Sequence, residues 1–294
     1  DIDSCLVEPI TKKIQAVSID YLQKEWVILD LQIKEDIKNL SKLNYGTIEI
    51  TSRVENDNKW IVVYMQDDGP YKYYLYDRAT REIKFLFVSN SKQESYSFAK
   101  MHTVQITSRD GLELVSYLTL PRWLDKGARL EKPIPLVLYV HGGPNSRDNK
   151  GYNATHQWLA NRGYAVLSVN YRGSTGFGKS FINAGDGQWA RKMQDDLEDA
   201  VKWAIDNNIA EKDKIVIMGG SYGGYATLVG MSMTPELYAA GIDIVGPSNL
   251  ETLMNSIPPY WKPVFAHLKK IIGASPDNEE GKKFLFERSP LNYV

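Results

Sequence analysis

The sequence predicts an α/β fold whose second half is a largely parallel sheet, preceded by a β-rich section. Near-continuous apolar runs at residues 135–140, 164–169 and 215–218 have the length of strands covered on both faces, and helical patterns alternate with them. Over residues 9–89, short alternating or aromatic-rich runs are instead separated by turn-forming residues, as in an antiparallel sheet. The chain is therefore expected to contain two sections of different architecture.

The β-rich section, residues 1–100, is expected to be a partial β-propeller. Its last strands form an antiparallel meander with tight turns, which is the arrangement of a four-stranded propeller blade. A blade takes ~40–50 residues and a propeller needs at least four, so the section has room for about two blades. A small independent antiparallel sheet is the alternative. Apolar residues at helical spacing over 33–43 predict a short helix, and the clearest strands are at 25–30, 47–51, 59–64, 71–76 and 82–87.

The second section, residues 101–294, is expected to adopt the α/β-hydrolase arrangement. A hairpin about the turn Asp110–Gly111 supplies two antiparallel strands ahead of the parallel ones. A helix is expected over 155–161, and a strongly amphipathic helix over 195–207 has Asp196 away from its apolar face. In such sheets the chemistry lies at the carboxyl ends of the strands.

Ser221 is the candidate nucleophile. It stands in a Gly-x-Ser-x-Gly pattern between an apolar β-branched run, residues 215–218, and a helical run, residues 224–231. Strand, tight turn and helix are the context of a nucleophile elbow, where glycine neighbours leave room for a strained serine backbone. A chance occurrence in a glycine-rich loop is the alternative. Ser221 is therefore predicted to act in acyl transfer.

Two backbone N–H groups are predicted to stabilise the oxyanion that such an attack creates. One belongs to Tyr222, directly after the nucleophile at a helix N-terminus. The other should come from Gly142 or Gly143, in the glycine turn that follows the run 135–140. His141 is expected to orient this turn and not to act as a base. A purely structural tight turn is the alternative.

Composition narrows the classes of protein further. A formal net charge of −1 argues against a nucleic-acid binder. The single cysteine, Cys5, excludes an internal disulfide and a thiolate metal site, and mildly favours a cytoplasmic location. No apolar run approaches the ~20 residues of a membrane span, so we expect no membrane partner. The net charge leads us to expect no nucleic-acid partner either. The first residues carry no signal-peptide pattern and look cut from something longer.

The motifs His141–Pro144, Asn170–Gly178 and Gly219–Tyr225 together resemble those of the prolyl oligopeptidase family of serine peptidases. The likeness is greatest to the acylaminoacyl-peptidase and dipeptidyl aminopeptidase branch. It covers residues 103–294 and, less specifically, the β-rich front. The resemblance implies a β-propeller that restricts access to short peptides, an α/β-hydrolase domain, and no cofactor or metal.

The same resemblance implies roles for individual residues. Ser221 would be the nucleophile, with the backbone N–H groups of Tyr222 and Gly143 as oxyanion donors. The aromatic stretch 259–265 falls where the family lines its specificity pocket, so the candidate substrate-binding residues are Trp261, Val264 and Phe265. Packing under a surface loop is the alternative for these three.

The sequence departs from the family pattern at both ends. By the resemblance, most of a propeller and the last part of the hydrolase domain are expected to be missing from these residues. In α/β-hydrolases the triad order is Ser, then Asp or Glu, then His, and by the resemblance both partners are expected beyond Val294. Asp243 and His267, the only histidine after Ser221, are the internal alternative, but neither follows a strand that would deliver it to the site. The chain by itself is therefore expected to be inactive.

The predicted function is that of a serine peptidase that hydrolyses short peptides through an acyl-enzyme on Ser221. A carboxylesterase-type hydrolase with the same elbow is one alternative, and a non-catalytic binding or pseudo-enzyme chain is another. Short peptides are the expected partners, and self-association is left open. The sequence specifies neither the peptide preference nor exo- versus endopeptidase action.

Overall fold

The computed structural model describes residues 1–43 and 45–294, which divide into two compact units. The first unit comprises residues 1–101 and 149–158, and the second comprises residues 102–148 and 159–294. The short excursion 149–158 thus leaves the second unit and packs with the first.

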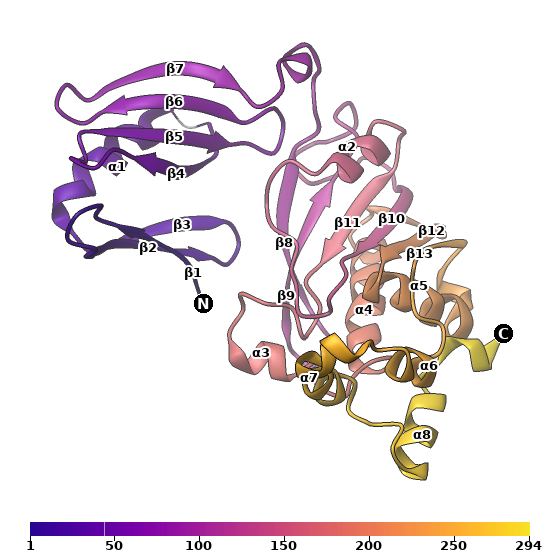
Figure 1. The fold of residues 1–294 in the computed structure, drawn as a ribbon. Helices are drawn as coiled ribbons and strands as arrows, with labels where there is room; N and C mark the ends of the chain where they lie inside the picture. The colour runs from indigo at the N-terminus through magenta and orange to yellow at the C-terminus, as the bar shows by residue number, and fades with distance from the viewer. Residues whose placement is uncertain (44) are drawn as a thin grey trace. The chain divides into compact units, whose positions relative to one another are not determined.

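Two antiparallel sheets make up most of the first unit (Figure 1). The smaller has the order β1-β2-β3, and the larger is a four-stranded meander in the order β4-β5-β6-β7. The strands are β1 (Ile2–Val7), β2 (Ile14–Asp20), β3 (Lys24–Ile28), β4 (Thr47–Arg53), β5 (Lys59–Met65), β6 (Lys72–Asp77) and β7 (Glu82–Val88). This meander is the strand arrangement that the aromatic-rich runs predict for a propeller blade.

A short helix covers the core of the first unit. It is built from η1 (Leu31–Ile33), α1 (Lys34–Leu40) and η2 (Ser41–Leu43), so the helix predicted over 33–43 is confirmed. Trp60, Tyr64 and Tyr76 are fully buried between it and the meander. The hydroxyl of Tyr64 donates to the Leu40 carbonyl at 2.7 Å, and Tyr76 donates to Asp36 at 2.8 Å. The tyrosines therefore bring both apolar area and satisfied polar atoms to this core.

The second unit is built on a six-stranded sheet with the order β13-β12-β10-β11-β9-β8. β10, β11, β12 and β13 are mutually parallel where they pair, whereas β9 runs antiparallel to β11. An antiparallel pair feeding a parallel sheet is the predicted α/β-hydrolase arrangement, and the fold class is confirmed. The strands are β8 (Met101–Thr107), β9 (Glu113–Thr119), β10 (Ile134–Val140), β11 (Ala165–Val169), β12 (Ala210–Gly220) and β13 (Ala240–Ile244).

Both faces of the central strands are covered, as their apolar runs predict. Leu136 and Leu138 point into the main core, which α4 and α5 complete. Val137 and Val166 point to the opposite face and pack with Leu159 at the end of α2. The period of two along a strand accounts for this alternation. The helices are α2 (Ala154–Ala160), α3 (Lys179–Asn183), α4 (Lys192–Asp206), α5 (Tyr222–Met233), α6 (Leu250–Asn255), α7 (Lys262–Ile272) and α8 (Glu279–Phe286).

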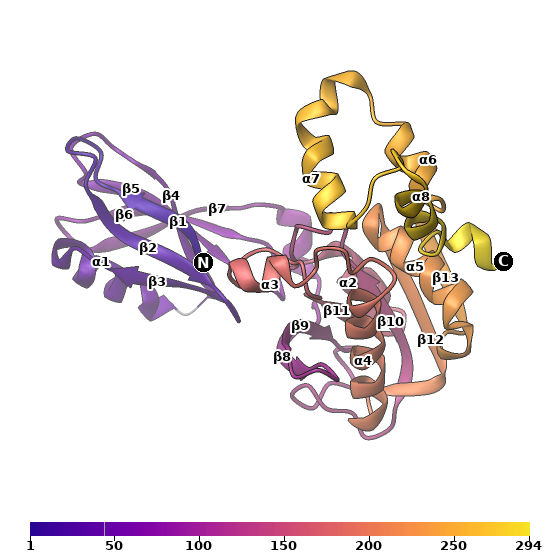
Figure 2. The ribbon, with the colours of Figure 1, turned by 90° about the horizontal axis from the view of Figure 1, so that it is seen from below.

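The last part of the second unit consists of the segments that follow β12 and α5 in the chain (Figure 2). β13 lies at the edge of the sheet, and all five of its residues are exposed. After it come α6 to α8 and short 3-10 turns at Pro259–Trp261 (η5) and Pro290–Tyr293 (η6). Within residues 1–43 and 45–294, no helix combines the length and the apolarity needed to span a membrane.

Candidate active site

Ser221 lies between β12 and α5, at the carboxyl end of a parallel strand of the sheet. Its backbone has φ 57° and ψ −117°, and it is exposed. Its N–H donates to the Ile244 carbonyl at the end of β13, at 2.9 Å. A non-glycine residue in the left-handed region is strained, and such strain is typical of functional turns. The turn therefore presents the serine hydroxyl outside the sheet.

The glycines beside Ser221 are required by close backbone packing. A Cβ on Gly219 or Gly223 would lie less than 3.0 Å from the carbonyl oxygen of Val140 in the neighbouring strand. The turn can sit against β10 only because these two positions carry no side chain. The neighbouring Gly220 has ordinary space, with its nearest atom 3.8 Å from a built Cβ.

A second glycine turn approaches Ser221 from the end of β10. A Cβ built on Gly142 would lie 3.4 Å from Cβ and 3.9 Å from Oγ of Ser221, so bare backbone faces the serine. Gly143 follows with φ 124°, a conformation that favours glycine. On the other side of the serine, Tyr222 is the first residue of α5, where a backbone N–H has no intrahelical acceptor. The structure thus brings together Ser221, Tyr222 and the Gly142–Gly143 turn.

His141 is held inside this turn by both of its ring nitrogens. Nδ1 lies 2.7 Å from the Gly142 carbonyl oxygen and Nε2 lies 3.0 Å from Oγ of Ser174. The ring stacks on Tyr171 at 4.4 Å, and the Tyr171 hydroxyl donates to the His141 carbonyl at 2.9 Å. Burial lowers the pKa of His141 to about 4. The hydrogen bond to the Gly142 carbonyl acts to raise this pKa, and the positive charge of Arg147 acts to lower it. His141 is therefore neutral near pH 7.

This depressed pKa predicts a loss of stability in mild acid. Between pH 6.5 and about 4, the unfolded chain binds a proton at this imidazole that the folded protein does not bind. The free energy of unfolding is therefore expected to fall as the pH is lowered through that window. Urea unfolding at a series of pH values measures it. The slope should flatten in His141→Gln; an unchanged slope in that variant contradicts the assignment.

Arg172 fixes the loop that carries Tyr171 and Ser174. Its Nη2 donates to Asp196 at 2.7 Å and to Asp110 at 2.8 Å, and its backbone N–H also donates to Asp196. The prediction that Asp196 lies off the buried face of its helix is wrong, because this carboxylate is fully buried. The guanidinium compensates the charge, so burial is tolerated. Arg172 also holds the pKa of Asp110 well below its usual range.

The predicted substrate-binding residues lie after the sheet, on η5 and α7. Trp261 is 50% exposed and Val264 is 44% exposed. Phe265 instead packs against the main core, with the Lys269 ammonium 4.6 Å from its ring. A pocket role for these three side chains stays a prediction.

Asp243 and His267 are engaged elsewhere. Oδ1 of Asp243 accepts the N–H of Gly246 at 2.7 Å, just beyond β13. His267 is exposed on α7, and its Nε2 lies 2.9 Å from Oδ1 of Asn145. The sequence did not single out Asn145 or Ser174 as site residues. Both are polar residues inside glycine-rich turns that follow sheet strands, and this position is the one local feature that could have indicated them.

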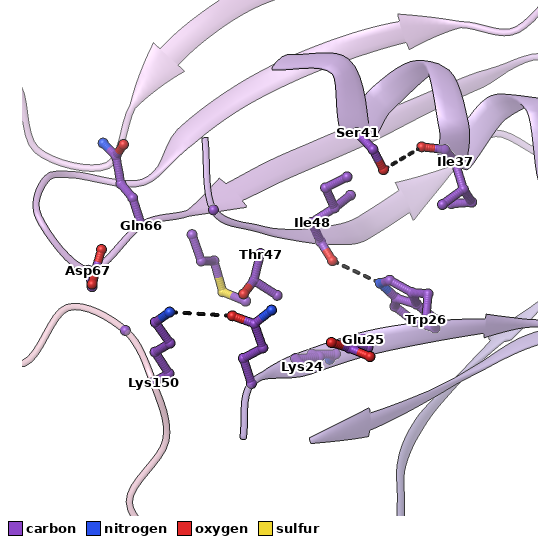
Figure 3. A pocket seen from close by; sticks show the side chains of 14 residues that line it. Lys24, Glu25, Trp26, Ile37, Ser41, Thr47, Ile48, Gln66, Asp67 and Lys150 are labelled. Carbon is purple, nitrogen blue, oxygen red and sulfur yellow. Dashed lines mark hydrogen bonds between the residues drawn. The ribbon is translucent and has the colours of Figure 1, made fainter. Parts of the chain in front are cut away.

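The first unit contains a separate polar pocket (Figure 3). It has a volume of about 440 Å³ between the β3 and β4 regions, and none of the predicted site residues line it. Two hydrogen bonds in the pocket are visible: Lys150 donates to Gln23 at 3.3 Å, and the Trp26 indole donates to the Ile48 carbonyl at 2.8 Å. Among the residues with a described position, no cluster of three or more His, Cys, Asp or Glu side chains could hold a metal ion.

A strained serine between a parallel strand and a helix, facing a glycine turn, defines the second unit as an α/β-hydrolase with a nucleophile elbow. Comparisons with known proteins then specify the family. Residues 150–280 match the model of the prolyl oligopeptidase family. This is the family that the motifs of the chain resemble.

Two curated relatives match almost all of the chain. It is 51% identical to dipeptidyl aminopeptidase BIII of Pseudoxanthomonas mexicana over 99% of its own length, and 38% identical to dipeptidyl peptidase family member 6 of Caenorhabditis elegans over 100%. It spans 42% of the length of each of these relatives. The solved structure of Pyrococcus horikoshii acylaminoacyl peptidase has the same fold, with a TM-score of 0.72 at 21% identity, and the match covers 100% of this chain and 44% of that one.

Proposed function

We propose that this chain carries the nucleophile and the oxyanion site of a serine peptidase that acts on short peptides. The observation that supports the proposal most is the exposed Ser221 at φ 57°, with the Gly142 backbone beside its side chain. Ser221 Oγ attacks the scissile carbonyl carbon, the amine leaves, and the acyl-enzyme is then hydrolysed by water.

The oxyanion donors in this proposal are the backbone N–H groups of Tyr222 and Gly143. A backbone donor at a helix N-terminus is directed at developing negative charge and needs no reorganisation during the reaction. Loss of one such donor costs about 2.7–4 kcal/mol of transition-state stabilisation in a comparable serine peptidase. His141 serves this site indirectly, because its ring is bonded to the Gly142 carbonyl.

The general base is proposed to come from residues outside 1–294. His267 is the one histidine that follows Ser221 in this chain, and its Nε2 is bonded to Asn145. A base must reach the serine hydroxyl at about 2.6–3.2 Å and needs a carboxylate partner of its own. Asp243, bonded to the Gly246 N–H, is not such a partner for His267.

The proposed substrates are peptides with a free N-terminus, from which dipeptides are released. The names of the two curated relatives, a dipeptidyl aminopeptidase and a dipeptidyl peptidase family member, support this class. The test uses the natural polypeptide that carries residues 1–294, assayed with dipeptidyl p-nitroanilides, their N-acetylated forms, and p-nitrophenyl esters of short acids. We expect the free dipeptidyl anilides to be cleaved best. Ester turnover without peptide turnover would instead indicate a carboxylesterase.

A further inference from the structure

The side-chain amide of Asn145 connects three segments around the candidate active site. Its backbone belongs to the turn after β10, two residues beyond Gly143. Its Nδ2 donates to the Gly173 carbonyl at 2.8 Å, and its Oδ1 lies 2.9 Å from Nε2 of His267 on α7. One half-buried amide therefore bonds both the 170–178 loop and α7 to the glycine turn.

The chemistry of the partners determines how this amide is oriented. A backbone carbonyl such as that of Gly173 can only accept, so the amide nitrogen of Asn145 faces it. The amide oxygen then faces His267 and can only accept in turn. His267 must therefore carry its proton on Nε2, and the two bonds form a directional chain from α7 through Asn145 to Gly173.

Both ends of this chain touch parts of the site. Gly173 precedes Ser174, whose Oγ is bonded to Nε2 of His141 at 3.0 Å, and His141 lies directly before Gly142. On the other side, His267 lies two residues after Phe265 on α7, the helix that carries two of the predicted substrate-binding side chains. Asn145 thus joins the predicted substrate-binding stretch on α7 to the glycine turn of residues 141–145. This turn is called the oxyanion turn below, because it carries the proposed donor Gly143.

We propose that Asn145 and His267 form a positioning pair that sets the place of α7 against the oxyanion turn, and so tunes how substrate side chains are bound. This inference rests on the proposed function for its kinetic effect but not for the contact itself. Asn145 and His267 hold other groups in place and do not act on the reacting atoms. His267 thereby has a role in this chain other than that of a general base.

A double-mutant cycle in the natural polypeptide tests the pair. His267→Leu removes the hydrogen-bond donor. It is expected to raise KM about five- to tenfold, which is the effect of losing one hydrogen bond, with kcat little changed. His267→Gln keeps an amide N–H donor and should restore most of the affinity. Asn145→Ala also frees the 170–178 loop, so it should lower kcat as well. Because both changes break the same bond, His267→Leu should add little to Asn145→Ala.

Hydrogen–deuterium exchange gives a readout that does not depend on activity. In a Ser221→Ala background, amides of residues 262–272 should exchange faster in Asn145→Ala and in His267→Leu, but not in His267→Gln or in Ala266→Ser, an exposed control on the same helix. Unchanged exchange of α7, or fully additive effects on KM, would overturn the pair. A third outcome separates the two proposals. If the natural polypeptide and all its variants lack peptidase activity while α7 exchanges as expected, the proposed function is overturned and the pair is not.

Discussion

Replacing Ser221 by alanine is expected to abolish peptide hydrolysis while leaving the fold intact. The hydroxyl is exposed at the turn between β12 and α5, so its removal leaves no cavity and no unpaired buried group. Loss of a serine nucleophile in a comparable peptidase lowers kcat by about 10⁶-fold. We expect a loss of at least ~10⁴-fold here, measured as release of p-nitroaniline from a dipeptidyl anilide by the natural polypeptide.

Ser232→Ala is the matched control for this experiment. Ser232 lies on the same helix, and its hydroxyl donates to the Leu228 carbonyl at 2.8 Å within the helix. Its removal should change activity by about twofold at most, since exposed or helix-internal substitutions of this kind are mild. A Ser221→Ala variant that keeps a tenth of the activity would rule out Ser221 as the nucleophile.

Gly219→Ala is expected to cause a large loss of stability for the addition of a single methyl group. The new Cβ would overlap the Gly223 backbone and the Val140 carbonyl, and backbone atoms cannot move aside as a flexible side chain can. We expect the free energy of unfolding to fall by about 3 kcal/mol or more. Urea unfolding followed by far-UV circular dichroism measures this loss.

Gly220→Ala provides the comparison, one residue along the same strand. A Cβ there meets the Ile244 carbonyl oxygen at 3.8 Å and the Ile244 Cβ at 4.0 Å, which is ordinary contact. Its effect on the free energy of unfolding should stay below about 1 kcal/mol. Equal losses in the two variants would show that glycine at 219 is not required by the packing of the elbow against β10.

Much of the fold can be predicted from the sequence because its elements have strong local patterns. Continuous apolar runs indicated β10, β11 and β12, and helical spacing indicated the helix over 33–43. The elbow could be predicted because strand, glycine turn and helix are consecutive in the chain. In each case the information lies within a window of about a dozen residues.

Other features depend on partners that are distant in sequence. Burial of Asp196 depends on Arg172, which is 24 residues away. The bond between Asn145 and His267 joins positions 122 residues apart. The association of residues 149–158 with the first unit likewise leaves no periodic signal. A local pattern indicates which face of an element is apolar, but not which polar side chain will meet an ion-pair or hydrogen-bond partner.

The placement of the predicted specificity residues shows the same limit. The family resemblance implied that the stretch 259–265 lines a specificity pocket. Trp261 is half exposed and Phe265 packs with the core, so the pocket role stays a prediction. Hydrophobicity alone does not distinguish a side chain that lines a pocket from one that packs beneath a helix.

Covalent labelling of Ser221 by a fluorophosphonate probe is the most direct test of the central claim, that this serine is an activated nucleophile. The probe is applied to the natural polypeptide and to residues 1–294 alone, and the labelled peptide is identified by mass. We expect rapid labelling at Ser221 in the natural polypeptide and little in residues 1–294 alone, because the general base is proposed to lie elsewhere. No label on Ser221 in an active natural polypeptide would contradict the claim. Rapid labelling of residues 1–294, abolished by His267→Ala, would contradict the placement of the base.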